Sequence, residues 1–232
     1  ILAQPNFYGI VEDYTGVADM CHAKKAMFVM NCKPSALAVL KTPAEWGADI
    51  ACGDAQSLGI PMCYGGPYVG FLACTNANIR KLPGRIVGAT TDVDGKRAFV
   101  LTLQAREQHI RREKANSNIC SIQSLMALYV TIYMSVMGYN GLKEACELSY
   151  GGAHYLADRL VATGKCTLAF DKPFFNEFAV RTTVPATKVL DALCAAGILG
   201  GVRVADDMLL VCVTEQRTKE EMDKFVEIVN NI

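Results

Sequence analysis

Short apolar runs separated by polar helical stretches characterise the first part of the chain. Three of these runs have the length of strands, at residues 26–30, 48–52 and 68–73, and a short surface helix is expected before them at residues 13–25. Runs that are apolar throughout are typical of strands covered on both faces of a sheet. The pattern therefore predicts an α/β unit with a buried, largely parallel sheet.

A polar stretch at residues 97–118 precedes two expected helices. The first helix is apolar and spans about residues 121–136, and the second spans about residues 142–162. The sequence Gly-Tyr-Asn-Gly lies between them and favours a break, because glycine is a poor residue for a helix interior. We expect the boundary between two domains here, with residues 1–138 in one and residues 139–232 in the other.

The last third of the chain alternates strand-like and helical segments. The expected strands are residues 166–170, 177–181 and 208–213, and the expected helices are residues 185–196 and 219–229. Pro185 suits the first turn of a helix, where its missing N–H is not needed. Thr218 is placed to cap the last helix, and Glu220 and Glu221 add favourable negative charge to its first turn. The pattern predicts a small α+β domain with an antiparallel sheet.

Composition and charge narrow the classes of function. Hydrophobic residues make up 51% of the 232 residues, enough for a sizeable core, and 23 Lys and Arg balance 23 Asp and Glu. A balanced chain has no bulk attraction for nucleic acid or an anionic membrane. No apolar run reaches the roughly 18 residues that span a bilayer, and the start, without Met or a signal pattern, is expected to lie inside a longer protein. The partner is therefore expected to be a small molecule or a protein.

Ten cysteines are scattered along the chain, mostly within apolar runs, and none forms a Cys-x-x-Cys pair. Disulfide scaffolds are short chains, and zinc sites need paired ligands. We therefore expect reduced, mostly buried thiols in a cytoplasmic protein, with no metal site. A Cys–His nucleophile pair has no local signature here, and His22 and His154, expected on surface helices, are given no role.

The glycine-rich segment at residues 59–67 lies between two expected strands. It lacks the Gly-x-Gly-x-x-Gly spacing and the following helix of a dinucleotide site. A tight reversal, in which glycines adopt positive φ, is the plainer interpretation.

Residues 104–114 carry a run of charge that allows two interpretations. Such a run is usually a solvated face. Against that, Arg106 and His109 recur at helical spacing with Arg111 or Arg112, just before the apolar helix.

Asn116, Ser117 and Asn118 follow this run and stand at the start of the expected apolar helix. Free backbone N–H groups and the helix dipole favour an anion such as phosphate at such an end. Ordinary capping of the helix explains the same residues without any ligand. The residues alone leave both interpretations open.

Five segments of the chain together resemble a known family. They are Gln-Pro-Asn-Phe-Tyr-Gly at residues 4–9, Gly-Asp-Ala-Gln-Ser-Leu-Gly at 53–59, Tyr-Gly-Gly-Pro-Tyr-Val-Gly-Phe-Leu-Ala at 64–73, Arg-Glu-Gln-His-Ile-Arg-Arg at 106–112 and Ser-Asn-Ile-Cys at 117–120. In this combination the chain resembles glycine decarboxylase, the P-protein of the glycine cleavage system, and in particular the alpha subunit of its two-subunit bacterial form. The resemblance covers nearly the whole chain.

The resemblance implies an α/β fold of the PLP-dependent transferases, aspartate aminotransferase-like and of fold type I. Residues 1–138 would be the C-terminal part of the large domain and residues 139–232 the small C-terminal α+β domain. About the first half of the subunit would then be absent.

The resemblance also implies where this fold holds its cofactor. A lysine shortly after the strand at residues 48–53 binds PLP covalently, and an aspartate at a strand end pairs with the pyridinium nitrogen. Here no lysine occurs between Lys41 and Lys81, and the strand at residues 26–30 ends in Met-Asn-Cys. The resemblance therefore implies that this chain contributes no catalytic lysine and is inactive by itself.

A partner subunit would complete the site. The resemblance implies that the beta subunit holds PLP covalently and that the active site lies between alpha and beta. Asn116, Ser117 and Asn118 would then bind the phosphate of the partner's PLP.

Arg106, Gln108 and His109 would line the shared cleft or the approach of the lipoylated H-protein. The implied reaction decarboxylates glycine and transfers its aminomethyl group to the lipoyl group of H-protein, as an oxidoreductase subunit within a cytoplasmic heterotetramer. The alternative is a stand-alone binding or scaffolding domain with a degenerate PLP fold and no catalysis.

Overall fold

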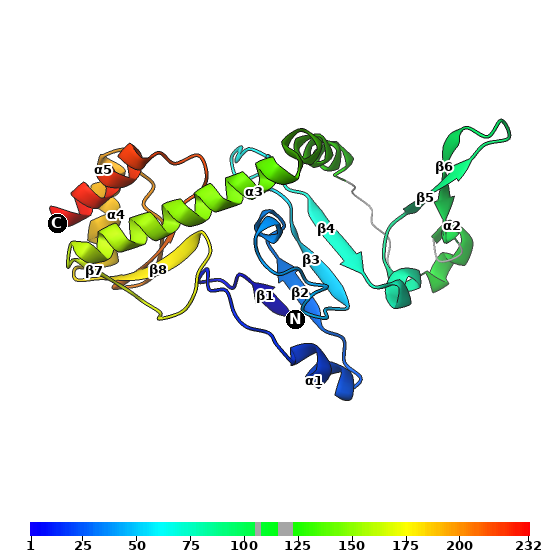
Figure 1. The fold of residues 1–232 in the computed structure, drawn as a ribbon, viewed down its shortest axis with the longest axis horizontal. Helices are drawn as coiled ribbons and strands as arrows, with labels where there is room; N and C mark the ends of the chain where they lie inside the picture. The colour runs from blue at the N-terminus through cyan, green and yellow to red at the C-terminus, as the bar shows by residue number, and fades with distance from the viewer. Residues whose placement is uncertain (105–107, 116–122) are drawn as a thin grey trace.

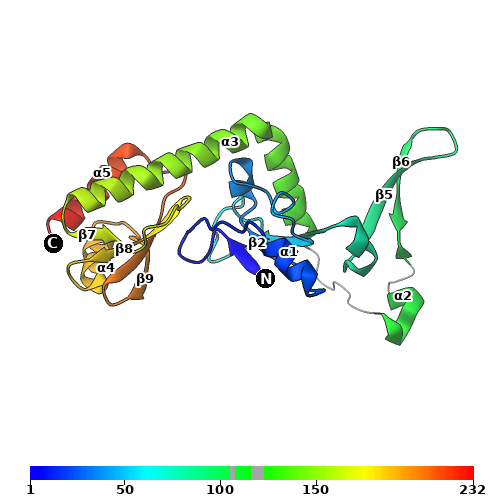
Figure 2. The same cartoon turned by 60° about the horizontal axis from the view of Figure 1, so that its bottom comes forward.

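The computed structural model describes residues 1–104, 108–115 and 123–232, and these form an extended molecule (Figure 1). A mixed sheet near the N-terminus occupies the middle, and a C-terminal unit lies at one end. A β-hairpin projects from the opposite end, and the second view shows the same arrangement (Figure 2). The long helix α3 runs from the central part to the C-terminal unit.

The central sheet has the order β1-β2-β3-β4, with strands β1 (Leu2–Gln4), β2 (Val29–Cys32), β3 (Ile50–Asp54) and β4 (Gly70–Cys74). The first three strands are parallel to one another and β4 is antiparallel to β3. The prediction of a largely parallel sheet is therefore confirmed. The short helix α1 (Val17–Ala23) precedes β2, within the segment where a surface helix was expected.

Burial of the sheet is one-sided, which corrects the expectation of strands covered on both faces. Phe28, Met30 and Cys32 are buried and pack under α1 with Trp46. Strand β3 is mostly half-buried, and Leu72 of β4 is exposed. The described residues place a hydrophobic cluster on part of the sheet only.

The segment that follows β4 contains a hairpin that the sequence pattern did not predict. The 3-10 helix η2 (Asn76–Lys81) follows β4, and strands β5 (Ile86–Thr91) and β6 (Arg97–Thr102) then pair antiparallel. An earlier 3-10 helix, η1 (Ser35–Ala38), lies between β2 and β3. No residue of β5 or β6 is buried. Residues 97–102 were expected to belong to a polar stretch, although they contain the apolar run Ala-Phe-Val-Leu at residues 98–101. The short helices α2 (Gln108–Arg111) and η4 (Arg112–Lys114) follow near the base of the hairpin.

Helix α3 (Ser124–Ala162) consists of two helices that meet at a kink, as the expected pair of helices predicted. Only Gly138 leaves the helical conformation, with φ 60° and ψ −175°. This backbone region is accessible essentially to glycine alone, and the helix changes direction there (Figure 2). The bend lies where the glycines predicted it, but the expected gap of several residues is wrong. The division into residues 1–138 and 139–232 stays a prediction.

One half of α3 is anchored on only one side. Met126, Val130 and Tyr133 pack against the cluster formed by the segment after β3. Gly59 (φ 86°) lies against the Tyr133 ring, where a Cβ would be only 2.3 Å from a ring carbon. The reversal at residues 59–67, with Gly65 at φ 87° and a bridge between its two sides, is confirmed.

The opposite face of this half of α3 is apolar and exposed. Its residues recur at helical spacing, at Leu125, Leu128, Ile132, Val136 and Tyr139. By length and composition alone α3 is the one helix of the described chain that could cross a membrane, although the sequence pattern was expected to contain none. Core helices of soluble proteins meet the same criterion.

The C-terminal unit is a four-stranded sheet of order β7-β8-β10-β9, antiparallel as predicted, and β9 is a strand that the sequence pattern did not predict. Three helices line one face, and residues such as Leu160, Phe178, Leu193 and Leu209 form its core. The elements are β7 (Cys166–Leu168), β8 (Glu177–Thr182), α4 (Ala186–Ala195), β9 (Val202–Ala205), β10 (Met208–Cys212) and α5 (Lys219–Asn230).

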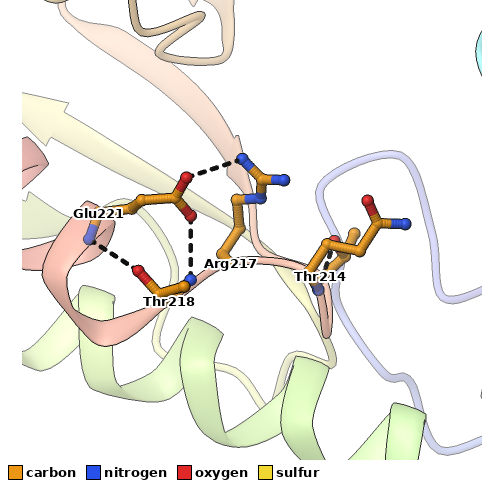
Figure 3. A network of polar contacts seen from close by, with 5 residues as sticks. Thr214, Arg217, Thr218 and Glu221 are labelled. Carbon is orange, nitrogen blue, oxygen red and sulfur yellow. Dashed lines mark hydrogen bonds and ion pairs between the residues drawn. The ribbon is translucent and has the colours of Figure 1, made fainter.

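Thr218 caps α5 as its sequence predicted. The Glu221 N–H donates to Thr218 Oγ1 at 3.2 Å, and the Thr218 N–H donates to Glu221 Oε2 at 3.0 Å (Figure 3). This reciprocal pair satisfies two N-terminal donors that the helix itself leaves free.

The described cysteines are free but less buried than expected. Only Cys32, Cys146 and Cys166 are buried among the nine described, and Cys120 lies outside the described residues. The difference has a local cause, since the exposed cysteines lie in a turn, on the solvent-facing side of helix α4 and at the end of strand β10. Those that are exposed are Cys63, Cys194 and Cys212.

Candidate functional site

The carboxyl ends of the parallel strands are the first place to look for a site, because ligands of open α/β sheets bind outside this edge. Strand β1 ends at Gln4, which is 3% exposed. Its amide donates to the Glu12 carbonyl at 2.9 Å and accepts from the Glu12 N–H at 3.1 Å. The segment after β1 is therefore a braced loop, which explains why a glutamine begins the Gln-Pro-Asn-Phe-Tyr-Gly motif.

The turn after β3 is the place where the resemblance required a lysine. The Gln56 N–H donates to Asp54 Oδ1 at 2.7 Å, and the Ala55 N–H donates to the Val69 carbonyl. Gln56 Nε2 is buried and has no hydrogen-bond partner among the described residues. An orphaned amide donor suits a hydrogen bond to a ligand or a partner, but an amide cannot form the covalent link that a lysine forms. The residues present do not fit covalently held PLP.

One lysine does lie at this edge, and the sequence analysis gave it no role. Lys33 directly follows β2, and its Nζ donates to Asn176 Oδ1 of the C-terminal unit at 3.1 Å. Asn176 is 2% exposed, and its Nδ2 donates to the Val213 carbonyl at 2.9 Å and to Cys212 Sγ at 3.3 Å. The Lys33 ammonium is thus held by the C-terminal unit, in contact with a buried amide.

Backbone contacts close the same seam. The Val11 N–H donates to the Pro173 carbonyl at 2.8 Å, and the Phe175 N–H donates to the Gly9 carbonyl at 3.2 Å. Gly9 has φ 79°, and a Cβ there would lie 1.9 Å from the Glu177 carbonyl oxygen. The loop after β1 can therefore approach the C-terminal unit closely only because its last motif residue is glycine.

Two thiols at the seam are poorly suited to nucleophilic work. Burial raises the pKa of the Cys146 thiol, which donates to the Ser35 carbonyl at 2.8 Å. Cys212 is exposed as a residue, but its sulfur accepts from the buried Asn176 amide, and desolvation of the thiol raises its pKa to about 11, with the Glu177 carboxylate adding to the effect and Lys33 opposing it. Both thiols therefore stay protonated near neutral pH. A reactive cysteine needs the opposite, a lowered pKa that makes the thiolate available.

His154, expected on a helix surface, instead packs into the seam. Its ring stacks on Phe174 with centroids 4.0 Å apart, and its Nε2 lies 3.2 Å from the Phe174 carbonyl oxygen. His22 lies 2.9 Å from the Asp49 carboxylate. Within the described part of the chain, no group of three or more His, Cys, Asp or Glu is placed to hold a metal ion.

The structure describes only two of the six residues predicted to line a site. Gln108 and His109 are exposed on α2, near the base of the hairpin and far along the molecule from the C-terminal unit (Figures 1 and 2). The remaining four lie outside the described residues, namely Arg106, Asn116, Ser117 and Asn118. Within this chain, Lys33 and Asn176 meet at the sheet edge instead. A lysine immediately after a buried strand is the sequence signal that could have drawn attention to this edge.

Comparison with known proteins gives a consistent result. A family model described as "Glycine cleavage system P-protein" matches residues 1–229. A relative from Desulfitobacterium hafniense, "Probable glycine dehydrogenase (decarboxylating) subunit 1", is 48% identical over 232 residues, covering 97% of this chain and 52% of the relative. One of the same description from Nitrosomonas europaea is 47% identical over 238 residues, covering 99% and 52%. The chain thus spans about half the length of these relatives.

Solved structures agree on the fold. The crystal structure of glycine decarboxylase (P-protein) of the glycine cleavage system, in inhibitor-bound form, superposes with a TM-score of 0.93 at 42% identity, covering 99% of this chain and 54% of that one. A NifS-like protein from Rickettsia africae is 13% identical with a TM-score of 0.68, covering 100% of this chain and 61% of its own, and shows likeness of fold alone. The predicted α/β fold of the PLP-dependent transferases, fold type I, is confirmed.

Proposed function

Because the chain belongs to the glycine cleavage system P-protein family, we propose that it is part of the non-catalytic alpha subunit of a glycine decarboxylase. With its sister beta subunit, the enzyme decarboxylates glycine and transfers the aminomethyl group to the lipoyl group of H-protein. The match to residues 1–229, with relatives described as subunit 1, is the observation that carries this proposal. Subunit 1 of an enzyme requires a second subunit, which we take to be beta.

The division of labour between the subunits follows from the turn after β3. Bound PLP would supply the electron sink for decarboxylation, and it needs a lysine for its covalent attachment. Gln56 and Ser57 occupy the corresponding turn here, and no lysine lies between Lys41 and Lys81. The beta subunit therefore provides the lysine, and this chain provides a neighbouring surface.

We place the polar residues before α3 on that surface. Asn116, Ser117 and Asn118 offer hydroxyl, amide and backbone donors to the phosphate of the cofactor held by beta. Support comes from the resemblance of the segment Ser-Asn-Ile-Cys at residues 117–120 to the family; α3 itself begins further along, at Ser124 with Gln123 as its N-cap.

Arg106, Gln108 and His109 line the shared cleft or the approach of H-protein. Support comes from the exposure of Gln108 and His109 in this chain, which leaves them accessible to a partner. 

Unpartnered apolar surface supports assembly into a larger complex. Leu125 and Val136 of α3 are 71% and 80% exposed, and Phe99 of the hairpin is 63% exposed. A two-stranded hairpin alone is marginally stable in water, and large exposed apolar patches mark interaction surfaces. We propose that the remainder of the subunit and the beta subunit cover these faces in a cytoplasmic α2β2 heterotetramer.

Reconstitution tests the proposal. A full-length alpha subunit containing this chain is mixed with beta subunit, PLP and lipoylated H-protein, and glycine-dependent CO₂ release is measured. We expect activity only when alpha and beta are both present. Activity of beta alone at the full rate, or failure of alpha to bind beta in a pull-down, would favour a scaffolding role instead.

Cofactor attachment is tested on the chain itself. After incubation with PLP and borohydride reduction, peptide mapping should find no stoichiometric pyridoxyl-lysine. A single fully modified lysine would contradict the assignment of PLP to beta.

A further inference from the structure

A cleft of about 520 Å³ opens in the C-terminal unit, between helix α5 and the turn that joins α4 to β9. This volume lies within the range of small-molecule sites. Its lining includes the buried apolar side chains of Leu156 on α3, Val211 on β10 and Phe225 on α5. The cleft therefore has an apolar floor built from three different elements.

The turn that forms one wall of the cleft carries an unused donor. Gly200 lines the cleft and is buried, yet its backbone N–H makes no hydrogen bond with the described residues. The neighbouring Leu199 also lines the cleft, but it is 95% exposed, so water can satisfy its N–H. Buried backbone donors are rarely left without a partner, so the Gly200 N–H indicates a ligand or a bound solvent molecule that accepts from it.

The packing of the turn fixes it in this position. A Cβ on Gly200 would lie 2.3 Å from Leu193 Cδ1, and Leu193 is fully buried. The Lys224 ammonium donates to the Ala196 carbonyl at 3.3 Å from the other side of the turn. The wall is thus set by the core and by α5, rather than by the turn alone.

Charge at the rim of the cleft favours an anion. The lining contains two cationic side chains, Arg217 and Lys224, and one carboxylate, that of Glu221. Figure 3 shows Arg217 reaching toward Glu221, at 3.5 Å between nitrogen and oxygen. Both side chains of this pair are about half exposed, and an exposed pair at such a distance contributes little. Arg217 can therefore exchange this partner for a ligand at small cost.

We propose that this cleft binds a small carboxylate with an apolar body. The carboxylate accepts from the Gly200 N–H and from Arg217, and the hydrocarbon part lies on the floor formed by Leu156, Val211 and Phe225. The site is independent of the proposed decarboxylase function, since none of these residues lies at the sheet edge or before α3. Two kinds of ligand have this combination of groups, a simple aliphatic carboxylic acid and a hydrophobic amino acid.

Titration of the ¹⁵N-labelled chain with hexanoate tests the site. We expect saturable amide shifts at Leu199 and Gly200, with a Kd on the order of 1 mM for a ligand of this size. The neutral analogue hexanamide should bind at least about tenfold more weakly, because it lacks the charge that Arg217 recognises. Tighter binding of leucine than of hexanoate would identify an amino acid, whose ammonium pairs with Glu221, and weaker binding would identify a simple acid.

Two substitutions at one position separate charge from shape. Arg217→Gln should weaken hexanoate binding about tenfold, and Arg217→Lys should retain most of the affinity. The matched control is Lys188→Gln on the exposed surface of α4, outside the cleft, which should bind as the wild type does. Circular dichroism verifies that each variant is folded.

Three results would overturn the proposal. They are the absence of saturable shifts up to about 10 mM hexanoate, equal affinity for hexanamide, and unchanged affinity in a folded Arg217→Gln variant.

Discussion

Replacing Asn176 with alanine should loosen the seam between the central sheet and the C-terminal unit. The side chain is 2% exposed and joins three groups: the Lys33 ammonium, the Val213 carbonyl and Cys212 Sγ. Asn176→Ala removes the acceptor of the lysine and leaves the Val213 carbonyl without this donor. The loss is therefore larger than that of one exposed hydrogen bond.

The magnitude follows from burial of each partner. The bond to the Val213 carbonyl is buried and is worth about 1 kcal/mol, and leaving that oxygen unsatisfied adds about 1 kcal/mol. The Lys33 bond involves a half-buried ammonium that water can partly solvate, so we discount it to about 1 kcal/mol. We expect Asn176→Ala to lower the free energy of unfolding by about 2–3 kcal/mol, and Lys33→Met by about 1 kcal/mol.

Urea unfolding with two probes measures this effect. Trp46, the single tryptophan, reports on the central cluster, and far-ultraviolet circular dichroism reports on the whole chain. In Asn176→Ala we expect a lower midpoint and a separation of the two transitions, because the units lose a shared contact. The matched control is Asn76→Ala, an exposed asparagine, with an expected change within about 0.5 kcal/mol.

A double-mutant cycle isolates the bond itself. The coupling energy between Lys33→Met and Asn176→Ala should be about 1 kcal/mol. Zero coupling, or destabilisation by Asn176→Ala no greater than by Asn76→Ala, would refute the reasoning.

Three further predictions follow from local chemistry. Thr218→Ala should cost about 1 kcal/mol of unfolding free energy by removing the cap of α5, and the same urea assay should find Thr218→Ser nearly neutral. Hydrogen bonding, first from the His22 ring, lowers the pKa of Asp49. The stabilisation of the folded state by this carboxylate is therefore present above the unfolded pKa of about 4 and is lost as pH falls through the lower folded pKa. Asp49→Asn should flatten the decline of the unfolding free energy at acid pH. Ser117→Ala with Asn118→Ala in the reconstituted full-length complex should weaken PLP affinity roughly ten- to a hundredfold by absorbance titration, with alpha–beta association unchanged; wild-type affinity would contradict the proposed contact with the phosphate.

The sequence pattern predicted those elements whose apolar side chains enter a core. The antiparallel C-terminal sheet belongs to this class. The cap at Thr218 was predicted for a different reason, because the capping residue and its partner Glu221 are only three residues apart. Strands β5 and β6 were missed although residues 98–101 form an apolar run, because this run lies beside the charged segment that follows it and was assigned to the polar stretch; in the structure neither strand has a buried residue. Gly138 marked the bend correctly, yet it is the single residue with non-helical φ and ψ, so one residue suffices where a longer gap was expected.

The candidate site was less accessible to sequence reasoning. Lys33 and Asn176 are 143 residues apart, and no local pattern links them. The absence of a lysine near Gln56 could be read directly, but its meaning came from the family resemblance and not from the residues alone. Which chain then holds the cofactor depends on a second polypeptide, and one sequence cannot supply that information.

The bend at Gly138 makes the second half of α3 a lever arm. From there to Ala162 the helix extends roughly 36 Å, so a rotation of about 10° at this one residue would move its far end by about 6 Å. No heavy atom lies within 4 Å of where a Cβ on Gly138 would be, so side-chain crowding at the bend does not resist that swing. The seam resists it instead, through the Lys33–Asn176 bond, the backbone bonds of Val11 and Phe175, and the cluster around Cys146.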